Sequence, residues 1–225
     1  MEGPSPPTAD GSLEVRRLVL GAFQSNTYLL RRVARETALV IDPGAEPGRI
    51  ESALDGWGTP PEAILLTHAH LDHVGAVADL VERYDAPVFL HPADRPLYDG
   101  ASDQAAAFGL SIRPPPPPDR SLAHGELLEL AGLRLEIRHA PGHSPGGVVL
   151  VTDGYAFVGD CVFAGSIGRT DLPGGDPAAL LRSIREHILT LPGDTILCSG
   201  HGPETTVSAE AATNPFLTGL LGRGG

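Results

Sequence analysis

The 225-residue sequence lacks the cysteine pattern of a disulfide-stabilised or thiolate-based protein. Its two cysteines, Cys161 and Cys198, lie far apart and form no CxxC pair. Lysine and arginine are also scarce, 16 residues against 28 aspartates and glutamates, and the formal net charge of −12 is not interrupted by a basic run. A nucleic-acid surface needs clustered cations, so we expect no DNA or RNA partner.

The sequence also lacks an apolar run of membrane-spanning length. Its first residues, MEGPSPPTADGS, show neither the charged nor the apolar region of a secretory signal. These absences predict a cytoplasmic protein without a membrane partner. Residues 1–12 are expected to form a disordered tail, and residues 13–225 a single domain large enough to bury a core without disulfides. The oligomeric state is left open.

Short runs of Val, Ile, Leu and Tyr, punctuated by Gly and Pro, predict many β-strands. Strands are expected at 13–20, 27–33, 37–44, 62–70, 87–91, 125–130, 133–140, 147–152, 155–160 and 194–200, and helices at 47–57, 74–84 and 177–189. Between 100 and 126 the pattern dissolves, and five successive prolines there predict an extended surface segment. Strand runs followed by helices, twice over, indicate an α/β fold of two β-sheets face to face with helices outside.

The stretch THAHLDHVG, residues 67–75, crowds three histidines and an aspartate behind an apolar run. His68 and His70 are spaced i, i+2, which in extended backbone points both imidazoles to one side. Asp72 and His73 follow where the chain turns into a helix, and they can face the same cavity from another angle. Burying four such groups without a metal would leave uncompensated polar atoms, so the stretch predicts a metal site.

Three later segments offer further ligands, each in a glycine-rich turn just past an apolar strand. They supply His143 in HAPGHSPGG, Asp160 in AFVGDCVFAG and His201 in LCSGHGPETT. Seven imidazoles and carboxylates are too many for one tetrahedral zinc and suit two ions with room for a water. We predict two divalent ions, zinc first, with iron or manganese as alternatives. The remaining histidines are expected to be structural: His91, His124, His139 and His187.

Together, THAHLDHVG, PGHSPGG, GDCVF and SGHGP, in this order, resemble the metallo-β-lactamase fold hydrolases from about residue 13 onward. The resemblance implies an αββα sandwich with the site at one edge between the sheets. It implies two ligand groups that share Asp160: His68, His70 and His143 for one ion, and Asp72, His73 and His201 for the other. Asp42, in VIDPG, matches a strand-end aspartate that supports the site from outside.

The dinuclear site implies hydrolysis without a serine or cysteine nucleophile. Two cations lower the pKa of a water between them to about 7 or below, so that hydroxide can attack a carbonyl. Asp72 is expected to orient this nucleophile. The segments GSIGRTDLPGGD, LPGDTILCSGHGPETT and AATNPF are similar to small glyoxalase II-like enzymes, which implies a thioester substrate such as S-lactoylglutathione. Arg169 and Thr170 resemble residues lining the substrate side, although Arg169 could instead pair with a nearby carboxylate.

Glutathione recognition is one departure from the resemblance. Full-length glyoxalase II enzymes grip glutathione with basic residues of a C-terminal helical domain, whereas here about two dozen residues follow His201, with only Arg223 near the end. Another thiol ester could therefore be the substrate.

Other activities share these motifs. Persulfide dioxygenases would bind a single iron through His68, His143 and Asp160, but GSIGRTDL lacks the cysteine that they tend to have near the Gly-Arg pair. Lactonases and β-lactamases share the ligands without the tail motifs. A metal-bearing interaction module without catalysis is the remaining alternative.

Overall fold

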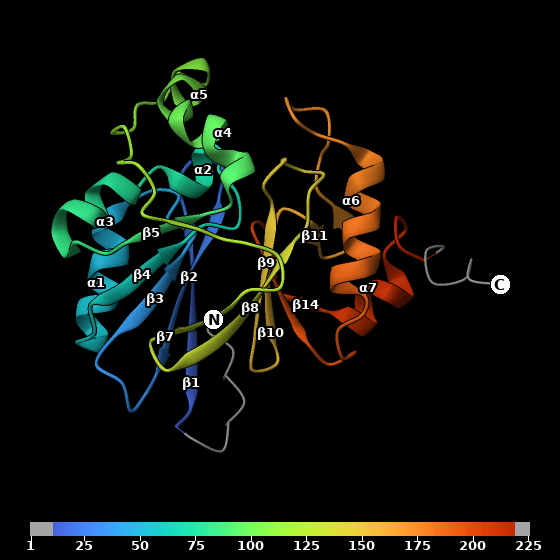
Figure 1. The fold of residues 1–225 in the computed structure, drawn as a ribbon, viewed down its shortest axis with the longest axis horizontal. Helices are drawn as coiled ribbons and strands as arrows, with labels where there is room; N and C mark the ends of the chain where they lie inside the picture. The colour runs from blue at the N-terminus through green and yellow to red at the C-terminus, as the bar shows by residue number, and fades with distance from the viewer. Residues whose placement is uncertain (1–10, 219–225) are drawn as a thin grey trace.

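Two six-stranded β-sheets pack face to face in the computed structural model, which describes residues 11–218 (Figure 1). The first sheet has the strand order β1-β2-β3-β4-β5-β6. Its strands are Leu13–Leu20, Ser25–Arg32, Ala38–Ile41, Pro61–Leu65, Val88–Leu90 and Arg120–Ser121. β1 to β3 are antiparallel neighbours, whereas β3 to β6 run parallel, so the sheet is mixed.

The second sheet comes from the later half of the chain and has the order β14-β13-β10-β9-β8-β7. In chain order its strands are Leu127–Leu130, Leu133–His139, Val148–Thr152, Tyr155–Gly159, Ile196–Ser199 and Thr205–Thr206. β10 and β13 are parallel and the other pairs are antiparallel. A short hairpin, β11 (Val162–Phe163) with β12 (Ser166–Ile167), follows β10.

Helices cover the outer face of each sheet (Figure 1). α1 (Pro47–Trp57) and α3 (Val77–Tyr84) cover the first sheet, and α6 (Pro177–Ser183) and α7 (Val207–Thr213) cover the second (Figure 1). α2 (Leu71–Val74), α4 (Arg95–Asp99) and α5 (Ala101–Ala107) lie at one end of the sheets (Figure 1). Alternation along the strands separates the layers: Leu30 packs between the sheets while its neighbour Leu29 packs toward the helices. In the second sheet Leu150 faces the first sheet and Val149 faces α6. The predicted αββα arrangement is confirmed.

Several predicted elements agree with the structure, and others differ for local reasons. The strand at 13–20 and the helix at 47–57 have the predicted bounds. The strand predicted at 62–70 stops at Leu65, because the amide of Thr67 donates to the side chain of Asp42 instead of a neighbouring strand. The first histidines of the motif therefore lie in a loop.

The predicted helices are also modified. The helix predicted at 74–84 begins earlier and is split into α2 and α3, because the chain between them packs against Gly44. The helix predicted at 177–189 changes after α6 into a π-helical turn, Ile184–Ile188. Within residues 100–126 the sequence showed no strand or helix pattern, and that interpretation was wrong at α5. This alanine-rich helix buries only Ala101 and Ala105. The proline run forms neither helix nor strand and is exposed or half-buried.

Two expectations fall mainly outside the described residues. The disordered tail predicted for residues 1–12 lies outside them except at residues 11 and 12, and Arg223 lies outside them as well. Within residues 11–218, none of the helices has the length and apolar character needed to cross a bilayer.

Candidate metal centre

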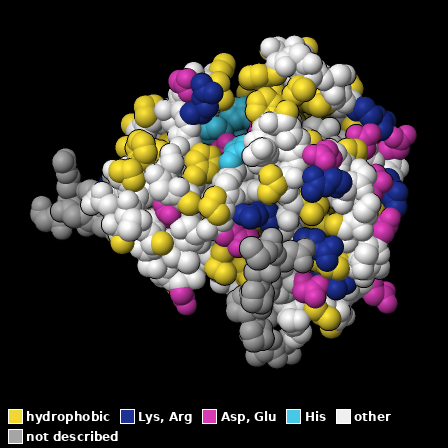
Figure 2. Space-filling model, turned by 180° about the vertical axis from the view of Figure 1, so that it is seen from behind, with side chains coloured by type: hydrophobic (Ala, Val, Ile, Leu, Met, Phe, Trp, Pro, Cys, Tyr) yellow, Lys and Arg dark blue, Asp and Glu magenta, His cyan; other side chains and the backbone are white. Residues whose placement is uncertain are grey.

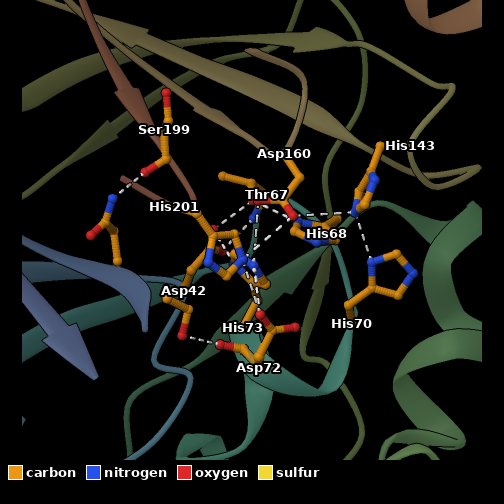
Figure 3. Close-up of polar contacts among 12 residues, drawn as sticks. Asp42, Thr67, His68, His70, Asp72, His73, His143, Asp160, Ser199 and His201 are labelled. Carbon is orange, nitrogen blue, oxygen red and sulfur yellow. Dashed lines mark hydrogen bonds and ion pairs between the residues drawn. The ribbon is translucent and has the colours of Figure 1, made fainter. Parts of the chain in front are cut away.

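The seven predicted ligands gather at one edge of the two sheets, in segments that follow strands of both (Figure 3). His68 and His70 lie in the loop after β4, and α2 then carries Asp72 and His73. The second sheet supplies the other three ligands: His143 between β8 and β9, Asp160 after β10, and His201 after β13. The site therefore forms only when the two halves of the chain are packed together.

Six of the predicted ligands fall into two groups, each with its ligand atoms within 4.8 Å of one another: His68, His70 and His143 in one, and Asp72, His73 and His201 in the other. A third group at the same spacing joins Asp42 to His68 and His73. Asp160 lies between the first two groups. Its Oδ2 is 3.4 Å from Nε2 of His143 and 3.6 Å from Nε2 of His201, and its Oδ1 is 3.6 Å from Nε2 of His73. The structure thus brings together the residues that the sequence resemblance groups, and their roles as metal ligands stay predictions.

Asp42 is buried and reaches one histidine of each group, His73 directly and His68 through Thr67. Its backbone has a φ of 50°, in the left-handed region, which turns the chain sharply after β3. One oxygen, Oδ2, accepts the hydroxyl hydrogen of Thr67 at 2.5 Å and lies 3.1 Å from Nδ1 of His73. Because the Thr67 hydroxyl uses its hydrogen in the bond to Asp42, its oxygen is left to accept a hydrogen bond from Nδ1 of His68 at 3.1 Å. Both imidazoles thereby keep Nε2 free for the centre.

Three buried polar atoms facing the centre have no hydrogen-bond partner: Nε2 of His68, Nε2 of His73 and Oδ1 of Asp160. Leaving such atoms without a hydrogen bond is costly, because they have lost water. Two of them make ion pairs instead, since Nε2 of His73 lies 3.6 Å from Oδ1 of Asp160 and from Oδ2 of Asp72. A divalent cation accepts electron pairs from all three, and imidazole with carboxylate is a donor set that zinc, iron and manganese use. The residues present therefore fit a metal centre.

The pKa values of the histidines differ strongly without a metal. Burial and neighbouring imidazoles lower the pKa of His68 well below its ordinary value, and the same causes lower that of His70 to about 4. Burial also opposes protonation of His73, but Asp72, Asp160 and Asp42 outweigh it and raise the pKa of His73 to about 10. A proton on His73 thus balances the carboxylates that a cation would otherwise neutralise.

His143 is oriented by the loop that contains Arg169. Its Nδ1 donates to the backbone carbonyl of Arg169 at 2.8 Å, which leaves Nε2 facing Nδ1 of His70 at 2.9 Å. The side chain of Arg169 points elsewhere and pairs with Asp171 at 2.7 Å, the alternative raised by the sequence. As substrate contacts, Arg169 and Thr170 stay predictions.

Sequence reasoning missed two residues that hold the site together. Asn26 donates from Nδ2 to the carbonyl of Ser199 at 2.8 Å and to that of Gly202 at 2.9 Å, on either side of His201. Asp94, fully buried, accepts hydrogen bonds from the loops of the first ligand group. Asp94 follows a predicted strand, as the ligands do, whereas nothing in the local sequence singles out Asn26.

The other four histidines form two pairs outside the centre. His91 stacks on His139 with ring centroids 4.0 Å apart, and the centroids of His124 and His187 are 5.0 Å apart. Among the described residues they belong to no group of three potential metal ligands.

Seen from behind, histidine side chains reach the surface in a hollow bordered by hydrophobic side chains (Figure 2).

Comparison with known proteins identifies the family. A model of the metallo-β-lactamase superfamily matches residues 20–201. The chain belongs to this superfamily. The match begins at the last residue of β1 and ends at His201, so it covers β2 to β13 and every predicted ligand.

Three similar proteins bear on the chemistry of this superfamily member. Hydroxyacylglutathione hydrolase GloC of Haemophilus influenzae is 38% identical over 209 residues, which are 91% of this chain and 98% of GloC. The structure of TTHA1623 in a di-iron-bound form is 49% identical, with a TM-score of 0.82, over 90% of this chain and 100% of that one. The B3 metallo-β-lactamase BLEG-1 is 40% identical, with a TM-score of 0.86, over 92% and 100%.

Proposed function

We propose that this chain is a dinuclear metallo-hydrolase that cleaves a thioester such as S-lactoylglutathione. The position of Asp160 carries the proposal, because its two oxygens face His143 on one side and His73 and His201 on the other. A carboxylate shared by two ligand groups suits a pair of neighbouring ions. The similarity to GloC over nearly the full length of both chains supports a thioester substrate.

In this proposal each ligand group would hold one ion, and Asp160 would contribute a carboxylate oxygen to each. The donors are imidazoles and carboxylates without thiolate, which suits zinc, iron or manganese. Zinc is our first choice, and the di-iron form of TTHA1623 supports iron as the alternative. When bound, the two ions would supply hydroxide near neutral pH and polarise the thioester carbonyl.

Asp72 has the position and charge expected of the residue that orients the attacking water. Its Oδ2 lies 3.1 Å from Nε2 of His201 and 3.6 Å from Nε2 of His73. Burial opposes ionisation of Asp72, but His73 and His201 outweigh it and hold the pKa of the carboxyl below its usual range. The carboxylate of Asp72 is thus ionised and can accept a hydrogen bond from water. The leaving group is a thiolate, which is stable enough to depart without a general acid.

The two cysteines are unsuited to covalent catalysis, which favours water as the nucleophile. Cys161 is 3% exposed, and burial together with the neighbouring charge of Asp160 raises the pKa of its thiol to about 12. Cys198 is 1% exposed, and burial raises its pKa as well. The reactive form of cysteine is the thiolate, so neither side chain is an effective nucleophile near neutral pH.

The test compares variants of the two ligand groups on the zinc-loaded chain. His68→Ala and His73→Ala should each lower thioester hydrolysis at least about 100-fold, because each removes a ligand of one ion. His187→Ala, outside the centre, is the control and should leave the rate unchanged. Assays with S-lactoylglutathione and with the lactoyl ester of a different thiol identify the thiol half.

Two outcomes would contradict the proposed function. The first is oxygen uptake with glutathione persulfide that survives His73→Ala but is lost in His68→Ala, which would indicate a mononuclear iron dioxygenase. The second is hydrolysis of a β-lactam without hydrolysis of any thioester, which would indicate a β-lactamase activity like the one named for BLEG-1.

A further inference from the structure

Asp94 is a buried carboxylate outside the proposed ligand set, and it joins two separate loops. Its Oδ2 accepts hydrogen bonds from the amide of Ala69 at 3.0 Å and from the hydroxyl of Ser144 at 2.8 Å. Its Oδ1 accepts one from the amide of Gly146 at 2.5 Å. The carboxylate is 0% exposed, so these three donors replace the water that it has lost.

The partners of Asp94 are chain neighbours of the three-histidine group. Ala69 separates His68 from His70, and Ser144 directly follows His143. The loop after β4 and the loop before β9 belong to different sheets. The carboxylate of Asp94 therefore accepts hydrogen bonds from both loops that present the three imidazoles.

Asp94 makes these contacts instead of the usual ones for its position. It stands at the N-cap of α4, where an aspartate commonly accepts a hydrogen bond from the first turn, yet its side chain makes no such bond. The approach of the second loop is also specific: a Cβ at Gly146 would lie 2.5 Å from the backbone nitrogen of Asp94. The contact thus depends on glycine at position 146 as well as on the carboxylate.

We infer that Asp94 is a positioning residue for the three-histidine half of the metal centre and sets the affinity and coordination geometry of the ion held there. The inference rests on the proposed dinuclear centre. It distinguishes Asp94 from Asp42, which contacts His73 directly and His68 through Thr67 and so serves both halves. Loss of Asp94 should affect one ion, whereas loss of Asp42 should affect both.

The expected size follows from comparable residues in other metal sites. Removing a partner that orients a metal ligand typically lowers metal affinity 10- to 100-fold. Asp94→Asn keeps the shape of the side chain but replaces one acceptor oxygen with an amide group that faces a donor. Ser144→Ala removes one of the three hydrogen bonds and should weaken the same ion less, about 3- to 10-fold. Asp99→Asn, at an exposed position of α4, is the matched control.

The experiment is a zinc titration of the full-length, metal-free chain against a chromophoric chelator, repeated with cobalt to record the d–d absorption spectrum. Wild type should bind two ions. Asp94→Asn should bind one ion 10- to 100-fold more weakly and the other within about threefold, with an altered cobalt spectrum. His143→Ala identifies the affected half, because it removes a ligand of the ion held by the three histidines. Adding Asp94→Asn to this variant should not further lower the affinity for the ion held by the other group.

The outcomes separate this inference from the proposed function. Two ions in wild type with unchanged affinities in Asp94→Asn, or with both ions weakened equally, would overturn the role of Asp94 and leave the dinuclear centre standing. No metal binding by wild type would overturn both. If Asp94→Asn does not fold, Ser144→Ala decides, because unchanged zinc affinities and cobalt spectrum in that variant would overturn the inference.

Discussion

At the scale of single residues, two of the predicted ligands, His68 and His73, are held by hydrogen bonds to side chains outside the two ligand groups. Asp42 is the clearest case, since Thr67 links it to His68 and its own oxygen faces His73. A metal site could be predicted from THAHLDHVG because its four candidate ligands lie within six residues of the sequence. The role of Asp94 could not be predicted, because it depends on two loops that meet only in the folded chain.

Replacing Asp42 should weaken both ions. Asp42→Asn is expected to lower zinc affinity 10- to 100-fold at both positions, with a parallel fall in hydrolysis, because Nδ1 of His73 and the hydroxyl of Thr67 lose the same acceptor. Asp55→Asn, on the exposed face of α1, is the control. Chelator competition measures the affinities, and two unchanged dissociation constants would contradict the role of Asp42.

We expect His91, which lies outside the metal centre, to make the stability of the fold depend on pH. Burial and His139 lower its pKa from 6.5 to about 4. Above pH 6.5 His91 is neutral in both folded and unfolded chains, but as the pH falls toward 4 only the unfolded chain takes up the proton, so stability is lost. His91→Gln should therefore lose less Tm than wild type between pH 7 and pH 5. Parallel Tm curves for the two proteins would show that His91 contributes nothing to this slope.

At the scale of elements, the site depends on glycines that let loops approach the ligands closely. A Cβ at Gly200 would lie 2.1 Å from Oδ1 of Asp160 and 2.7 Å from Cε1 of His73. Strand periodicity predicted most strands well, but it could not show where β4 ends, because the amide of Thr67 donates to the side chain of Asp42 rather than to a neighbouring strand. The alanine-rich α5 was missed because it buries too few side chains to show a periodic pattern.

Gly200→Ala is expected to reduce hydrolysis at least about 100-fold, because the added methyl group must displace Asp160 or His73. Gly56→Ala is the matched control: it lies in α1 with no atom within 4 Å of the added Cβ. That substitution should leave the rate unchanged and stabilise the helix by about 0.5–1 kcal/mol. Steady-state rates and thermal unfolding test the pair, and full activity in Gly200→Ala would contradict the site geometry.

At the scale of the whole molecule, the metal centre links the two sheets. The first sheet leads into the loop and helix of THAHLDHVG, and the second supplies His143, Asp160 and His201. The layered fold could be predicted from the order of strands and helices. The pairing of β10 with β13, which brings Asp160 and His201 to the same edge, lies beyond local patterns because about three dozen residues separate the two strands.

Removing the metal should destabilise the whole fold. An ion present at 100 times its Kd stabilises the folded chain by about 2.7 kcal/mol. For a protein of this size that corresponds to roughly 5–10 °C in Tm. Thermal unfolding of the metal-loaded chain before and after dialysis against a chelator measures the shift, and equal Tm values would contradict preferential binding of the ions by the folded chain.

The most direct test of the central claim is the metal content per chain of protein purified without added metal, with S-lactoylglutathione hydrolysis measured on the same sample. The dinuclear thioesterase predicts two divalent ions per chain together with turnover. One iron per chain, no thioester hydrolysis and oxygen uptake with glutathione persulfide would contradict it.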